Sequence, residues 1–208
     1  ALGWVAARID IRQVVQESRA LPRSYLTGLN FLLNEQPDKA IDAFIEAVKI
    51  DPHTIELHFA LGSLFRRRGE IDRAIRMHQN LVDREDISEE QRLQALAELG
   101  QDFLKAGLLD RAEAVYARLR NTRLNDQALQ CLLEIYQQEK DWPRAIEAAQ
   151  ALPDHESLLW RKEVANFHCE IAAGELANSR PKEARQAVDN ALAVNPRCVR
   201  ASLILGDI

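Results

Sequence analysis

The sequence contains few of the residues that break or crosslink a chain. It has 8 glycines and 7 prolines among 208 residues, which is too few for an all-β protein with many tight turns. The three cysteines, Cys131, Cys169 and Cys198, are far apart and none belongs to a CxxC pair. Neither a zinc site nor a disulfide framework is therefore predicted. We interpret all three as small buried apolar residues of a protein from a reducing compartment.

Other absences exclude classes of function. No run of about 20 apolar residues occurs, so the sequence holds no complete membrane span. The net charge is −5, which argues against non-specific nucleic-acid binding, because that requires a basic surface. Aromatic residues make up only 6%, and the strong helix formers Ala, Leu, Glu, Gln and Arg dominate. An all-helical protein is predicted.

The first 20 residues form a segment of their own. Apolar ALGWVAA is followed by Arg8 and Arg12. This could be the end of a longer apolar segment, with Trp4 at the bilayer interface and basic residues on the cytoplasmic side. It could equally be the start of an ordinary amphipathic helix. We assign 1–20 as an N-terminal or juxtamembrane helix.

An internal repeat organises the rest of the chain. Gly28 and Gly62 are 34 residues apart, and Gly62, Gly100 and Gly206 each follow a leucine. The first three glycines are each followed by a Phe at three residues, an Ala at twelve and a ring at sixteen. This spacing is the tetratricopeptide pattern, W-x₂-L-G-x₂-Y…A-x₃-F…P. The matching residues are Phe31, Phe65 and Phe103, then Ala40, Ala74 and Ala112, then Phe44, His78 and Tyr116.

The pattern predicts two antiparallel helices per unit, with small residues where the helices touch and rings beside them. One pair cannot bury its apolar face alone, so the units stack. We therefore predict an all-α tetratricopeptide-repeat solenoid, a right-handed superhelix of helix pairs, over residues 21–208. The units are expected at 21–54, 55–88, 89–126, 127–164 and 165–198, with a sixth that stops inside its first helix.

Several positions depart from the pattern. Leu133 stands where the fourth unit should have Gly, and Ala172 stands there in the fifth. Four extra residues fall in DREDISEEQ, where Ser88 and Gln91 form a predicted capping box. The segment PDHESLLWRKE predicts an added loop and a longer following helix.

No catalytic or cofactor-binding residues are predicted, so we expect no enzyme. The repeat accounts for most glycines, Gly69 and Gly107 as turn residues, and none is left for a phosphate loop. His155-Glu156 opens like a zincin motif, but Leu159 stands where the second His belongs. His78 occupies a ring position of the core.

The remaining candidates are surface residues of the first helices, which line the concave groove in this class of repeat. Exposed aromatics and arginines often anchor interfaces. Alternatively, the candidates in the first repeat, 21–54, pack against the N-terminal helix or a neighbouring subunit. Leu29 and Ser63 replace the Asn that would clamp a C-terminal carboxylate, so a chaperone-tail role is not favoured. The predicted groove residues are Tyr25, Leu29, Leu32, Phe59, Ser63, Arg66, Arg67, Gln101, Lys105, Gln130, Glu134 and Gln137.

Four segments go beyond a generic repeat. They are GSLFRRRGEIDRAIRMHQNL from Gly62, YLTGLNFLLNEQPDKAIDAF from Tyr25, LGQDFLKAGLLDRAEAVY from Leu99 and EVANFHCEIA from Glu163. They resemble the lipopolysaccharide assembly protein B family, also called YciM. The opening GWVAAR resembles the family's sequence just after its membrane helix.

The resemblance implies a Gram-negative inner-membrane protein whose N-terminal helix anchors a repeat array on the cytoplasmic face. Members end in a rubredoxin-like domain with four zinc-binding cysteines. They are understood to be adaptors that promote turnover of the LpxC deacetylase by the FtsH protease. This sequence lacks the full membrane helix and the rubredoxin-like domain, so we interpret it as a fragment with no cofactor of its own. Its expected partners are FtsH, LpxC or other proteins of the pathway, with a homodimer possible. The alternative is a structural assembly hub without a role in proteolysis.

Overall fold

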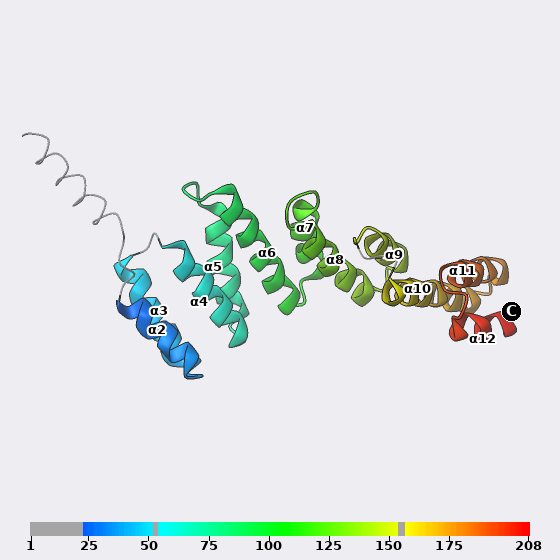
Figure 1. The fold of residues 1–208 in the computed structure, drawn as a ribbon, viewed down its shortest axis with the longest axis horizontal. Helices are drawn as coiled ribbons and strands as arrows, with labels where there is room; N and C mark the ends of the chain where they lie inside the picture. Colours follow the sequence, from blue (N-terminus) through cyan, green and yellow to red (C-terminus); the bar gives the residue numbers. More distant parts are fainter. Residues whose placement is uncertain (1–22, 52–53, 154–156) are drawn as a thin grey trace, which may run out of the picture. The chain divides into compact units, whose positions relative to one another are not determined.

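The computed structural model describes residues 23–51, 54–153 and 157–208, without the side chain of Tyr25. Within these ranges the regular structure is helical, with helices α2 to α12 and no strand (Figure 1). The prediction of an all-α chain is confirmed. The helix assigned to 1–20 and the His155-Glu156 pair lie outside the described residues.

The helices follow one another in pairs joined by short turns. The chain divides into two compact units, Ala1–Leu81 and Val82–Ile208, and each is described by itself. The first unit contains α2 (Arg23–Leu33), α3 (Pro37–Ile50), α4 (Ile55–Arg67) and most of α5 (Ile71–Asp83). The second contains α6 (Glu89–Lys105), α7 (Leu109–Leu119), α8 (Asn125–Glu139), α9 (Trp142–Gln150), α10 (Leu158–Ala177), α11 (Pro181–Val194) and α12 (Val199–Gly206).

The turn inside each pair has the same geometry in all five pairs. One residue adopts a left-handed backbone, and the next N–H donates to the carbonyl five residues earlier, as in Glu70 to Phe65 at 2.8 Å. This is the Schellman arrangement that ends many helices. The prediction that Gly69 and Gly107 lie in these turns is confirmed. The left-handed residues are Glu35, Gly69, Gly107, Lys140 and Ser179, with φ of 55°, 81°, 71°, 58° and 58°.

Three glycines permit close contact between paired helices. A Cβ added to Gly28 would lie 2.6 Å from Phe44 Cε1, and one added to Gly100 would lie 2.7 Å from Tyr116 Cζ. At Gly62 the nearest atom would be His78 Nε2, at 2.3 Å. All three rings are fully buried. The predicted pairing of glycine with a ring sixteen residues later is confirmed, as is the core position of His78.

The fourth and fifth pairs reach the same contact with other residues. Leu133 and Ala149 are sixteen residues apart and belong to one buried cluster. Ala172 and Val188 have the same spacing within the next cluster. In the fourth pair the larger residue is on the first helix, and in the fifth pair it is on the second. In both pairs a larger residue is matched by a smaller one, which keeps the interior close-packed. Gly206 differs from the other glycines at this position, because its Cβ would meet no atom within 4 Å.

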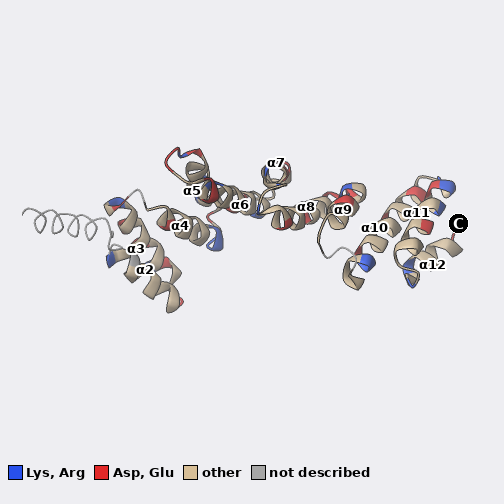
Figure 2. Ribbon diagram, turned by 45° about the horizontal axis from the view of Figure 1, so that its top comes forward, with Lys and Arg blue, Asp and Glu red and all other residues tan. Residues whose placement is uncertain are grey.

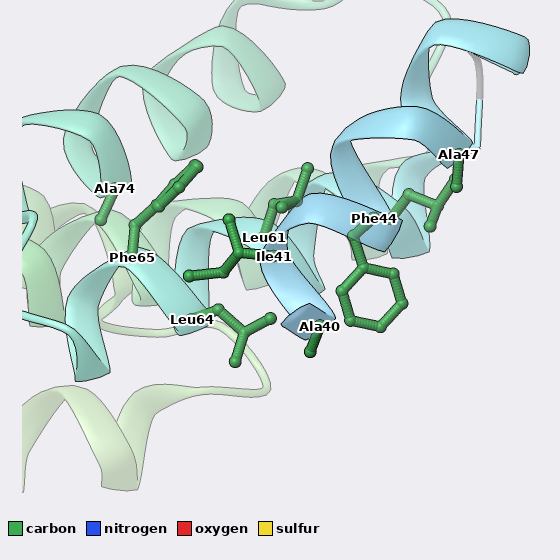
Figure 3. Close-up of a cluster of buried hydrophobic side chains, with 9 residues drawn as sticks. Ala40, Ile41, Phe44, Ala47, Leu61, Leu64, Phe65 and Ala74 are labelled. Carbon is green, nitrogen blue, oxygen red and sulfur yellow. The ribbon is translucent and has the colours of Figure 1, made fainter. Parts of the chain in front are cut away.

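The core of the first unit joins its two pairs. Leu61, Leu64 and Phe65 of α4 lie between α3 and Ala74 of α5 (Figure 3). The members of this cluster are Ala40, Ile41, Phe44, Ala47, Leu57, Leu61, Leu64, Phe65 and Ala74. In the second unit, one cluster joins α8, α9 and α10, and another joins α10, α11 and α12.

Side-chain caps mark the starts of α6 and α10. Ser88 Oγ accepts from Gln91 N at 3.2 Å and Gln91 Oε1 accepts from Ser88 N at 3.0 Å, so the predicted capping box is confirmed. Ser157 caps α10, a helix of 20 residues that begins seven residues before the expected boundary at 165. None of the described helices is both long and apolar enough to cross a membrane.

Candidate protein-binding surface

Two predicted groove residues of the first unit meet at one pocket. Leu32 of α2 and Arg67 of α4 line a hollow of ≈ 430 Å³. Leu29 is 36% exposed, and Tyr25 lies on α2 with a side chain outside the described part. The other lining residues are Glu35, Pro37, Leu64 and Arg68.

The remaining candidates of the first unit differ in their exposure to solvent and in their contacts. Phe59 is half-buried, with its ring centroid 6.2 Å from that of His78, so part of its surface is covered by its own repeat. Ser63 and Arg66 are also half-buried, and Arg67 is exposed. Figure 2 shows basic residues gathered at the end of α4. Arg68, in the turn, is 3.2 Å from both Asp38 and Glu70.

In the second unit, Gln101 is tied to a neighbouring helix. Its Nε2 donates to Cys131 Sγ at 3.3 Å, and the side chain is half-buried. Glu134 is exposed and accepts from Gln138 Nε2 at 3.4 Å. The other candidates are Lys105 and Gln130, which are exposed, and Gln137, which is half-buried. That these residues together line one groove stays a prediction.

Two groups beside Gln101, the Tyr116 hydroxyl and the Cys131 thiol, have pKa values that are raised by burial. Desolvation raises the pKa of Tyr116, and it also raises the pKa of the Cys131 thiol. The Tyr116 hydroxyl donates to the carbonyl of Ala97 at 3.3 Å. These groups stay neutral at ordinary pH and serve packing, since a general acid or base needs a pKa near the working pH.

Sequence reasoning missed a repeated contact between a cation and a ring. The charged groups of Lys39, Arg73, Arg111 and Arg144 lie 5.7, 3.9, 4.3 and 4.5 Å from the ring centroids of Phe31, Phe65, Phe103 and Tyr136. Each cation follows its ring by eight residues, across the turn within the pair. That spacing is the signal from which the contact could have been predicted.

Arg144 also organises a polar cluster. Its Nε donates to Asp141 Oδ2 at 2.6 Å, and its Nη1 donates to Glu113 Oε1. Tyr136 Oη donates to the same Glu113 oxygen at 3.1 Å. The hydrogen bond from the Arg144 side chain lowers the pKa of Asp141. The cluster joins α7, α8 and α9, which gives it a structural role.

The fold also brings together two cysteines that are 29 residues apart. Cys169 Sγ and Cys198 Sγ lie 3.8 Å from each other, and both residues are buried. Burial, with the hydrogen bond to Cys198, raises the pKa of Cys169 to about 12. The prediction of small buried residues is confirmed, but sequence spacing had not indicated that these two are neighbours. Among the described residues, no group of three or more His, Cys, Asp or Glu side chains could hold a metal ion.

Comparison with known proteins decides the family. The tetratricopeptide repeat model matches residues 25–89, 59–128 and 170–208. The chain belongs to the tetratricopeptide repeat family. A solved tetratricopeptide repeat protein from Parabacteroides merdae aligns with a TM-score of 0.63 at 14% identity, over 91% of this chain and 75% of that one.

Curated relatives cover the whole chain. It is 40% identical over 210 residues to lipopolysaccharide assembly protein B of Escherichia coli. It is 38% identical over 218 residues to the protein of that name in Haemophilus influenzae. The alignments include 100% of this chain and 54% and 55% of the relatives, so the chain spans about half their length. The resemblance predicted from the sequence is confirmed.

Proposed function

We propose that this chain is the protein-binding part of an adaptor that regulates lipopolysaccharide biosynthesis. In this proposal the adaptor lies at the cytoplasmic face of the bacterial inner membrane and brings the LpxC deacetylase to the FtsH protease. Holding two partners on one scaffold raises the effective concentration of each for the other. Tetratricopeptide repeats along the chain, and relatives named for lipopolysaccharide assembly, support the proposal.

The observation that carries the proposal is the uncovered surface of the first helices. Leu29 is 36% exposed on α2, and Arg67 is exposed beside the pocket that it shares with Leu32. Arg67 makes no ion pair with any described residue, so its charge is available to a partner. Apolar surface next to an unpaired guanidinium is typical of an interface.

If the partner presents carboxylates to this surface, its binding should depend on Arg66 and Arg67. We expect that R66E/R67E in the full-length protein reduces recovery of LpxC and FtsH after crosslinking in membranes. Because Arg66 has contacts of its own, R67E alone is the sharper variant. The circular dichroism spectrum should keep its helical signal in both variants, since neither residue is fully buried.

The matched control reverses two exposed cations on second helices, Arg118 of α7 and Lys182 of α11. R118E/K182E changes the net charge by the same amount as R66E/R67E and should recover both partners normally. If R66E/R67E recovers both partners as well as the parent protein does, the predicted groove contact is wrong.

A second candidate function is a structural hub for the synthetic machinery with no role in proteolysis. A scaffold of tetratricopeptide repeats, or a homodimer of it, fits this role as well. The level of LpxC in cells that lack the protein separates the two. A raised level supports the adaptor, whereas an unchanged level with disordered envelope assembly supports the hub. The zinc site that we propose for the rubredoxin-like part would lie beyond this chain.

A further inference from the structure

A second hollow of the first unit lies on the side of its second helices. It has a volume of ≈ 420 Å³ and is lined by α3, α4 and α5. Leu61 and Phe65 of α4, shown in Figure 3, contribute apolar surface together with Met77 of α5. The complete lining is Ile45, Val48, Lys49, Leu61, Phe65, Arg73, Arg76, Met77 and Asn80.

The charged residues that line this hollow all carry the same sign. Lys49, Arg73 and Arg76 are cations, and no lining residue is acidic. Lys49 Nζ lies 2.6 Å from Glu46, and Arg73 lies 2.5 Å from Glu70, so two of the charges are partly balanced. Arg76 is exposed and makes no hydrogen bond or ion pair with any described residue.

Arg73 is held in a fixed orientation. Its guanidinium carbon lies 3.9 Å from the centroid of the Phe65 ring, and its Nη1 donates to Glu70 Oε2. A guanidinium stacked on a ring keeps the other N–H groups at its edge available to a carboxylate. A partner would therefore meet an ordered donor beside an apolar floor.

The second unit has a hollow at the same place in the repeat, with the opposite charge. Its volume is ≈ 370 Å³, and it is lined by α9, α10 and α11. Six lining positions on α10 and α11 lie 110 residues beyond a counterpart in the first hollow, so Phe65 becomes Glu175, Arg73 becomes Glu183 and Arg76 becomes Gln186. His168 has no such counterpart. Glu175 and Glu183 are acidic, and no Lys or Arg lines this hollow. The shared position shows that stacking creates the hollow, whereas the charge is particular to each repeat.

We propose that the hollow between α3 and α5 is a docking site for an acidic amphipathic segment of a partner protein. An aliphatic side chain of the segment enters between Val48, Phe65 and Met77, and flanking carboxylates pair with Arg76 and Lys49. Three cations are too few to follow a nucleic-acid backbone, and the apolar floor suits a peptide. The site is separate from the predicted groove of the first helices and does not depend on the partners proposed for that groove.

Binding of a synthetic peptide to the full-length protein tests the site. The probe is a fluorescein-labelled helical peptide of leucine and glutamate, arranged so that leucines form one face. We expect saturable anisotropy binding that weakens with salt, because the pairing is electrostatic. K49E/R76E should reduce the affinity about tenfold, as expected when two attractive rim contacts become repulsive.

Three controls make the result decisive. R118E/K182E reverses the same number of charges elsewhere and should leave the affinity unchanged. R67E alters the predicted groove and should also leave it unchanged. A peptide with lysine in place of glutamate should not bind. Absence of saturable binding, equal losses in K49E/R76E and R118E/K182E, or loss in R67E alone would overturn the proposal. Unchanged melting temperatures and helical content confirm that each variant folds.

Discussion

Gly100 and Tyr116 illustrate how single residues set the distance between paired helices. The Cβ of an alanine at Gly100 would lie 2.7 Å from Cζ and 2.9 Å from Cε2 of a ring that is fully buried. Because the ring has no free space to move into, G100A should destabilise the protein by about 1–3 kcal/mol. The midpoint of urea unfolding, followed by circular dichroism, measures this loss.

Gly174 provides the matched control for this substitution. It also lies inside a helix, α10, but an added Cβ would meet no atom within 4 Å. Alanine is a better helix former than glycine, so G174A should raise stability by up to about 1 kcal/mol. A loss of stability in G174A as large as that in G100A would show that contact with Tyr116 is not the cause of the first result.

At the scale of single residues, a contact can be predicted from the sequence when both residues belong to the recurring pattern. A contact outside that pattern cannot. The glycine and ring pairs could be predicted because both partners belong to the recurring pattern. The contact of Cys169 with Cys198 could not be predicted, since it depends on how α10 meets the start of α12. Tertiary contacts that depend on how separate helices pack have no signal in a single sequence.

The paired helices are held together by a turn and by a cation placed over a ring. Arg111 tests the second contact most cleanly, because it lies 4.3 Å from the Phe103 centroid and forms no ion pair with a described residue. R111Q should reduce the stability by about 0.5–1 kcal/mol, the usual strength of an exposed cation–ring contact. Thermal unfolding of the variant and of the parent measures the difference.

Arg118 serves as the control on the same helix. It is exposed and lies over no ring in the described part of the chain. R118Q should therefore leave the melting temperature nearly unchanged, and R111K should lose less than R111Q because it keeps the charge. A full loss in R111K or no loss in R111Q would contradict the attraction between the positive charge and the ring.

The presence of the helices could be predicted more reliably than the residues at which they begin. The capping box at Ser88 placed the start of α6 correctly, because its two hydrogen bonds are local. The predicted longer helix after the PDHESLLWRKE segment is confirmed as α10, but it begins seven residues before the predicted boundary of its repeat at 165. Ser157 caps this helix with one bond to Trp160 N and no reciprocal glutamine or glutamate, so the local signal is weaker.

At the scale of the whole molecule, buried thiols couple stability to pH. The pKa of Cys169 in the folded chain is about 12, whereas an unfolded cysteine titrates near about 8.5. The unfolded chain therefore releases this proton first, and the contribution of Cys169 is present below about pH 8.5 and is lost towards pH 12. Melting temperatures of the parent chain should fall across this range.

C169A isolates the effect, since other groups also titrate in alkali. The substitution should lower the melting temperature at pH 7, where the buried thiol fills space, and flatten its decline above about pH 8.5. Parallel pH profiles for C169A and the parent would mean that the thiol does not contribute to the decline.

Function was predictable in part at this scale. The repeat predicted a protein-binding scaffold, because glycines and rings were already accounted for by packing. The basic hollow between α3 and α5 was not predicted, since its residues come from three helices. Groove positions were predicted from the register alone and stay a prediction, whereas the hollow on the other side requires the packed side chains.

Leu133 with Ala149, and Gly100 with Tyr116, are two solutions to one constraint. The first puts the bulk on α8 and the second puts it on α7, while both interiors remain filled. The combined volume of the two positions, rather than either residue alone, therefore determines how well the pair packs. Relatives should vary the two together, and a change that is harmful alone becomes neutral when its partner changes first. Evolution of these repeats then proceeds by paired substitutions, with the glycine of the consensus as one option among several.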